Sequence, residues 1–143
     1  MATITNQAAL SYNGVTTLSN IAVGELVEVL TATKTAADTT YTAGGVKTFV
    51  ISLVNSSAAA LTGLTVTDTL GSYTFSGNTL YPLTYVTGSL LYYVNGALQA
   101  TPTVTATAPL TVTGVTVPAG GSAMLIYTAR VNEYAPLGVE DSI

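Results

Sequence analysis

The opening segment of the chain alternates between apolar and polar side chains. Its residues of even number form one row, which contains Ile4, Asn6, Ala8, Leu10 and Tyr12. Polar side chains occupy most of the positions between them. A period of two is typical of a β-strand that buries one face. We therefore predict that residues 4–12 form a strand whose buried row is apolar except for Asn6.

Similar period-two runs continue along the chain, separated by Gly, Pro and Asn, and helical periodicity is absent. The predicted strands cover residues 25–36, 46–55, 61–70, 85–94, 97–104, 110–117 and 122–133. Asn95-Gly96 lies between two of these strands and is a strong hairpin signal. Seven or eight short strands joined by turns indicate an all-β fold, an immunoglobulin-like β-sandwich.

The N-terminal part is expected to be organised differently from the rest. Residues 15–24 have no sharp turn signal apart from Asn13-Gly14 before them, and we interpret them as an extended connector. The predicted organisation is an N-terminal strand at 1–14, the connector at 15–24 and the sandwich at 25–143. Residues 71–83 are expected to form a loop.

Composition excludes several functional classes. Charged residues make up 7% of the chain, and Lys34, Lys47 and Arg130 are its only basic residues, so a phosphate-binding face for nucleic acid is not expected. Cys and His are absent, which removes disulfides, the common zinc, copper and iron sites, and the usual nucleophile–base pairs. We expect no cofactor and no metal site. No apolar run is long enough for a membrane helix, and no secretion signal is recognisable.

Four segments together resemble a known family. They read LTATKTA, KTFVISLVNSSAAALTGLTVTDTLG, LTYVTGSLLYYVNG and VTVPAGGSAMLIYTARVN. In this order and spacing they resemble the DUF11 repeat domains of bacterial surface proteins, over roughly residues 25–143. The resemblance implies an immunoglobulin-like sandwich at the cell surface.

The two ends of the chain complete the resemblance in an unusual way. Domains of that family usually finish with a strand of the form SITNTATV, and here the sequence stops at Asp141-Ser142-Ile143. The N-terminal TITNQAAL is similar to that final strand. The resemblance therefore implies a sandwich that lacks its last strand and carries a copy of it at the other end.

A sandwich without its last strand exposes an apolar groove and unpaired backbone groups, which favours the addition of a strand. We expect residues 4–12 of one subunit to fill the groove of the next, as in donor-strand complementation. Such a contact is head-to-tail and can propagate. The expected function is a structural subunit of an extracellular filament or pilus (fimbrium) on a cell or spore surface, with the chain itself as its partner.

Other arrangements remain open. The N-terminal strand can fold back into its own groove, as in a circularly permuted monomer, or the chain can be a fragment of a longer repeat protein. The alternative function is an immunoglobulin-like adhesin or stalk domain that binds a host or cell-surface ligand. No group of residues supports an enzyme that acts on an external substrate.

Three polar residues lie an even number of positions from apolar residues of the same predicted strand: Asn6, Lys34 and Asp68. They are therefore predicted to face inward with those apolar residues. Their combination resembles the spontaneous isopeptide bonds of Gram-positive adhesin and pilin domains. That resemblance assigns Lys34 as nucleophile, Asn6 as acceptor and Asp68 as the acid that shuttles protons. Burial favours the neutral amine and the protonated acid that the reaction needs. Because Asn6 belongs to the donor strand, the bond would link neighbouring subunits; the alternative is a Lys34–Asp68 ion pair.

The remaining polar and aromatic residues are weaker candidates. Glu133 is a second possible acid for the cross-link. Glu25 and Glu28 are three residues apart on a predicted strand and so face opposite sides, and Glu140-Asp141 offers too few oxygens for calcium. A sugar platform or simple packing can explain the cluster of Tyr73, Tyr81, Tyr85, Tyr92 and Tyr93, and packing is favoured.

Overall fold

Alternating burial along the strands shows how the sequence builds this fold. In β12 (Leu110–Val117), Leu110, Val112, Val115 and Val117 are buried, and in β13 (Ser122–Val131) every second residue is buried.

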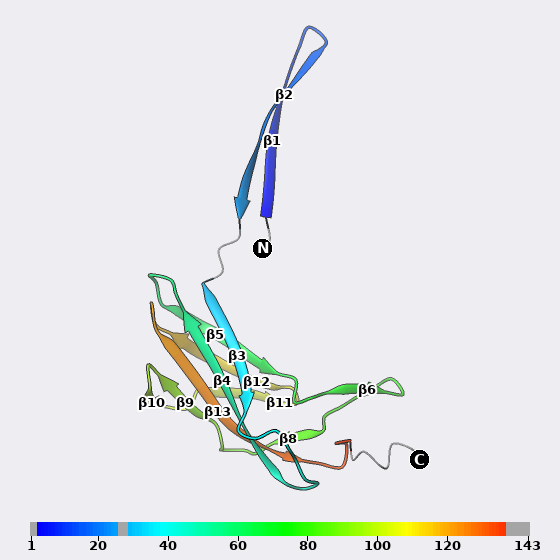
Figure 1. The fold of residues 1–143 in the computed structure, drawn as a ribbon, viewed down its shortest axis with the longest axis vertical. Coiled ribbons are helices and arrows are strands. Elements are labelled where there is room, and N and C mark those ends of the chain that lie inside the picture. The colour runs from blue at the N-terminus through cyan, green and yellow to red at the C-terminus, as the bar shows by residue number, and fades with distance from the viewer. Residues whose placement is uncertain (1–2, 26–28, 137–143) are drawn as a thin grey trace.

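The computed structural model describes residues 3–25 and 29–136 (Figure 1). The other strands are β1 (Thr3–Tyr12), β2 (Val15–Glu25), β3 (Leu30–Ala36), β4 (Val46–Asn55), β5 (Leu61–Asp68), β6 (Tyr73–Phe75), β7 (Asn78–Leu80), β8 (Leu83–Tyr85), β9 (Leu91–Val94), β10 (Ala97–Gln99) and β11 (Thr103–Thr107).

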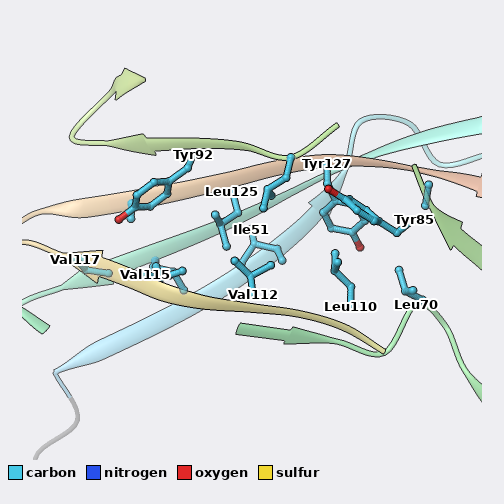
Figure 2. Packing of buried hydrophobic residues seen from close by; sticks show 14 residues of the cluster. Ile51, Leu70, Tyr85, Tyr92, Leu110, Val112, Val115, Val117, Leu125 and Tyr127 are labelled. Carbon is cyan, nitrogen blue, oxygen red and sulfur yellow. The ribbon is translucent and has the colours of Figure 1, made fainter. Parts of the chain in front are cut away.

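Two antiparallel sheets form the body of the protein. The larger has the order β10-β9-β13-β4-β3, with β8 also paired to β13, and the smaller has the order β11-β12-β5. Side chains from both sheets meet in one apolar cluster, which includes Ile51, Leu125 and Tyr127 from the larger sheet and Leu110 and Val112 from the smaller one (Figure 2). The sheets therefore form the two layers of a β-sandwich.

Buried polar groups in this core have partners. The amide of Asn55, at the end of β4, is fully buried and donates hydrogen bonds to the carbonyl oxygens of Ala59, Val117 and Pro118. Its own oxygen accepts hydrogen bonds from the backbone N–H and the hydroxyl of Ser57. Asn55 thus ties the end of one sheet to the turn that enters β5 in the other.

The predicted all-β fold is confirmed, because the described residues contain strands and no helix. Strands 46–55 and 110–117 have the predicted bounds. Other predicted strands are divided: 85–94 contains the end of β8 and all of β9, and 97–104 contains β10 and the start of β11. The expected loop at 71–83 holds the small β6–β7 hairpin. The immunoglobulin-like strand order and the absence of a final strand remain predictions.

The N-terminal region differs most from its predicted form. The expected connector at 15–24 belongs to β2, which pairs antiparallel with β1, and β2 ends at Glu25 where the predicted strand 25–36 was to begin. The turn between them uses Asn13 and Gly14, with φ of 49° and 74°. Two positive φ values in a two-residue loop match the twist of a β-hairpin. This strong turn signal explains why residues 15–24 pair with β1.

Candidate functional site

A groove opens between one edge of each sheet. Among the described residues β3 pairs only with β4, and β5 pairs only with β12, so each has one unpaired edge. The space between these two edges is a cavity of about 480 Å³, open to solvent. Apolar side chains line most of it, among them Leu30, Ile51, Leu53, Leu64 and Val66. The groove therefore combines an apolar floor with backbone groups that lack strand partners.

The inward face of β3 is exposed because no residue of the described ranges 3–25 and 29–136 covers this groove. Ala32 and Lys34 lie opposite Leu53 and Ile51 of β4, which are buried. Ala32 and Lys34 themselves are exposed and line the groove. The parity prediction for Lys34 was thus right about the face, but the side chain is not enclosed.

Lys34 and Asp68 meet across the groove. The Nζ atom of Lys34 lies 2.7 Å from Oδ2 and 2.9 Å from Oδ1 of Asp68. Nζ is also 4.7 Å from the centre of the Phe49 ring, within cation–π distance. The Asp68 side chain is 3% exposed and that of Lys34 is 39% exposed. The pair therefore has one buried member and one that water still reaches.

Two further donors hold the Asp68 carboxylate. Its Oδ1 accepts a hydrogen bond of 2.9 Å from the backbone N–H of Leu70, and its Oδ2 accepts one from the hydroxyl of Tyr127. Burial alone would raise the pKa of Asp68, but the hydrogen bonds from Lys34, Tyr127 and Leu70 outweigh it and hold that pKa below its usual value. Burial and the neighbouring carboxylate raise the pKa of Tyr127 far above its usual range. In the single chain the pair is consequently ionic, with a charged Asp68.

Asn6 lies elsewhere in the chain. It belongs to β1, opposite Ala22 of β2, in a hairpin that stands apart from the sandwich (Figure 1). Every side chain of β1 is exposed, and the apolar residues Ile4, Leu10 and Tyr12 are between 63 and 76% exposed. The structure thus brings Lys34 and Asp68 together within one chain and leaves Asn6, with its apolar row, outside its own groove.

Comparison with known proteins identifies no relative. No family model, no curated protein and no solved structure matches this chain significantly. The resemblance to DUF11 domains accordingly remains an expectation drawn from the sequence. In the described part of the chain no helix is long and apolar enough to cross a membrane.

The other predicted candidates are dispersed. Glu133 is exposed in the turn after β13, and Glu25 ends β2 opposite Thr3. Glu28 and Glu140-Asp141 lie outside the described residues. Of the tyrosines, Tyr85 and Tyr92 are buried in the core and Tyr81 packs against it, which supports packing over a sugar platform.

Sequence reasoning missed two polar residues that the fold places in prominent positions. Tyr127 has the parity of core residues on β13, and only the sheet-to-sheet packing shows that its hydroxyl reaches Asp68. Lys47 is the more buried lysine, and it donates hydrogen bonds to the carbonyl oxygens of Asp38 and Thr40 and to the Asp38 carboxylate. Its odd number, shared with Ile51 and Leu53 of the same strand, is the signal that could have revealed it.

Proposed function

We propose that this protein is the structural subunit of a filament, in which residues 4–12 of each copy insert into the groove between β3 and β5 of the next copy. The observation that carries the proposal is the groove itself, because two adjacent sheet edges have no strand partner in the described part of the chain and lie above an apolar floor. Open edges of this kind recruit strands from other chains.

The donor strand matches the groove in chemistry and length. The even-numbered row of β1 contains no charged residue, as suits a floor formed by Ile51, Leu53, Leu64 and Val66. With 10 residues, β1 is longer than β3, which has 7, and β5, which has 8. It can therefore pair along the full length of either edge.

The hairpin limits how β1 can pair. One edge of β1 is already bonded to β2, which leaves one edge for an acceptor strand. In the hairpin form, β1 adds to either β3 or β5. Successive side chains of a strand point to opposite faces of its sheet. The even-numbered side chains of β1 can therefore enter the space between the sheets whether β1 pairs with β3 or with β5.

A covalent bond between Lys34 of the acceptor and Asn6 of the donor follows from this arrangement as a finer proposal. Nζ of Lys34 attacks Cγ of Asn6, the Cγ–Nδ2 bond breaks, and ammonia leaves. The Lys34–Asp68 pair supplies the chemistry: insertion of β1 removes water from Lys34, and one proton passes from Nζ to the carboxylate over the 2.7 Å contact. A neutral pair is favoured over an ionic one when water is excluded.

Substitutions on the two faces of β1 test the filament. We expect Leu10→Asp to abolish filaments in negative-stain images and to give monomers on gel filtration, because a buried unpaired charge is very costly. Ser11→Asp is the matched control, as it places the same charge on the adjacent exposed position of the other face and should leave filaments intact.

Two outcomes would contradict the proposal. If Leu10→Asp polymerises like the unmodified chain, the donor row is not what joins the subunits. If the unmodified chain is monomeric and binds a cell-surface ligand, the adhesin function is the better description. The resemblance to surface-protein domains supports placing the filament on the outside of a cell or spore.

A further inference from the structure

The β1–β2 hairpin contains a bulge that changes which face its apolar residues occupy. Pairing runs regularly from Thr3–Glu25 to Gln7–Ile21, and resumes with Ala9 opposite Leu18. Two residues of β2, Ser19 and Asn20, therefore lie opposite the single residue Ala8. Ser19 stabilises the irregularity: its hydroxyl accepts a hydrogen bond of 2.9 Å from the Ala8 N–H, and its carbonyl accepts one of 2.8 Å from the Gln7 side chain.

The bulge places Leu18, Ile21 and Val23 of β2 together on the face opposite the apolar row of β1, whereas Val15, beyond the bulge, pairs with Tyr12 and shares the face of that row. Directly opposed residues of an antiparallel pair point to the same side. The pairs Gln7–Ile21, Thr5–Val23 and Ala9–Leu18 thus put Leu18, Ile21 and Val23 on the face of the odd-numbered residues of β1. Without the extra residue, Leu18 would point away from Ile21 and Val23.

Side-chain contacts agree with this assignment. The hydroxyls of Ser11 and Thr16 are 3.1 Å apart on the odd-numbered face of β1. On the other face, Ile4 lies so close to Gly24 that a Cβ there would be 3.2 Å from an Ile4 side-chain carbon. On the face with the β1 row, β2 thus has the small residues Ala22 and Gly24 beside Asn6 and Ile4, and Val15 beside Tyr12.

The row on β2 is also exposed, slightly less than the row on β1. Leu18, Ile21 and Val23 are between 56 and 62% exposed. A groove receives only one face of a hairpin, so insertion of the β1 row leaves the β2 row uncovered. Neighbouring exposed apolar side chains of this kind mark an interaction site.

We propose that Leu18, Ile21 and Val23 pack against a further copy of this chain, on the outer face of its larger sheet; this inference depends on the proposed function. That face has a shallow hollow of about 380 Å³, lined by residues that include Val54, Tyr93, Met124 and Ile126. Val54 and Met124 are exposed, although they lie at the middle strands β4 and β13 of the sheet.

Charge and continuity favour a copy of the chain over another partner. Neither the β2 row nor the lining of the hollow contains a charged residue. If β1 adds along β3, the odd-numbered face of the hairpin becomes continuous with the outer face of β3 and β4, which includes Thr33 opposite Ser52. One surface then spans the donor hairpin and the acceptor sheet; Arg130 lies on it towards the far end of β13, outside the hollow. Two such surfaces can stack with the row of each over the hollow of the other, and polymerisation supplies the high local concentration.

Engineered disulfides test this contact, since the chain has no Cys of its own. Filaments are assembled from equal amounts of an Ile21→Cys chain and a tagged Met124→Cys chain, and are then treated with a mild thiol oxidant. We expect a mixed disulfide dimer on a non-reducing gel. The control exchanges Ile21→Cys for Ala22→Cys, which is adjacent but on the other face, and should give a yield lower by a factor of about ten or more. Leu18→Cys with Val54→Cys is a second pair. It should cross-link if the β2 row is shifted along the outer face so that Ile21 does not lie over Met124.

The results separate the two proposals. Filaments in which neither pair cross-links above its control overturn the β2 contact and leave the donor-strand function intact. Absence of filaments from the unmodified chain overturns both. Cross-linking by either pair above the Ala22→Cys control supports the contact.

Discussion

Tyr127 donates the hydrogen of its hydroxyl to Asp68, the same carboxylate that binds Lys34 across the groove. Tyr127 lies in the middle of the larger sheet, and its ring is stacked on Phe49 with 5.5 Å between the ring centres. Figure 2 shows it within the core, among Tyr85 and Leu110. The acid proposed for the cross-link is therefore held by a side chain of the buried core.

Removing the hydroxyl of Tyr127 should weaken the fold without disturbing its packing. We expect Tyr127→Phe to lower the free energy of unfolding by about 1–2 kcal/mol, because a buried carboxylate loses one donor. Urea denaturation measures the change. Tyr93→Phe, at a half-exposed position on the outer face, is the control and should be close to neutral. Equal effects of the two substitutions would show that the hydrogen bond is unimportant.

Acid should remove the stabilisation that Asp68 provides. The folded-state pKa of Asp68 is lowered, so its ionised form stabilises the fold above its unfolded-state pKa of about 3.9, and the contribution is lost as pH falls through the folded-state value. We expect Asp68→Asn to be less stable at neutral pH by about 1–3 kcal/mol and to lose less stability than the unmodified chain between about pH 5 and pH 3.

Glu133→Gln is the control for that pH series, because Glu133 is exposed in a turn. It should reproduce the pH dependence of the unmodified chain. If Asp68→Asn has the same acid dependence as this control, the ionised state of Asp68 does not contribute to folding.

Substitutions of Lys34 or Asn6 should remove the covalent cross-link without preventing polymerisation. We expect filaments of the unmodified chain to give a ladder on boiled denaturing gels, with each link lighter than the summed subunits by one ammonia in mass spectra. Lys34→Arg and Asn6→Ala should both abolish the ladder and retain filaments that dissociate on boiling. Thr5→Ala is the control on the opposite face. A ladder that survives Lys34→Arg would contradict the assignment of Lys34 as nucleophile.

Loss of the Asn55 amide should destabilise the sandwich strongly. Its five hydrogen bonds join the end of β4 to the turn before β5 and to β12. We expect Asn55→Ala to cost about 2–4 kcal/mol, because buried carbonyl oxygens lose their donors. Ser56→Ala, which removes one exposed hydrogen bond to Val29, is the comparison in the same denaturation experiment. A cost below that of Ser56→Ala would be contrary to this role.

The alternation of apolar and polar residues predicted the features that depend only on residues close together in the sequence. The strands 46–55 and 110–117, and the inward parity of Lys34 and Asp68, follow from a pleat of period two. Parity does not predict burial, which depends on whether another strand covers the face; Lys34 is for this reason inward and yet 39% exposed. The contact of Tyr127 with Asp68 depends on how two sheets stack, and no local pattern encodes that distance.

The hairpin was missed for a different reason. Asn13-Gly14 is a strong turn signal, but the expected role of 15–24 as a tether gave β2 no partner. The apolar residues of β2 also change from an even number at Leu18 to odd numbers at Ile21 and Val23. This change hides the period-two pattern until the extra residue at Ser19–Asn20 is known. A one-residue irregularity in one strand thus concealed the pairing of both.

The distance of the hairpin from its own groove has a consequence for growth. In the proposed filament every joined pair would use the groove of one subunit and the hairpin of the other, so a chain of subunits would have a direction and two chemically different ends. One end of the proposed filament would present an empty groove, and the other a free hairpin. The Leu10→Asp variant, with an intact groove and an impaired donor row, should accept one neighbour and then stop growth at that end, which makes it a selective cap for one pole of the assembly.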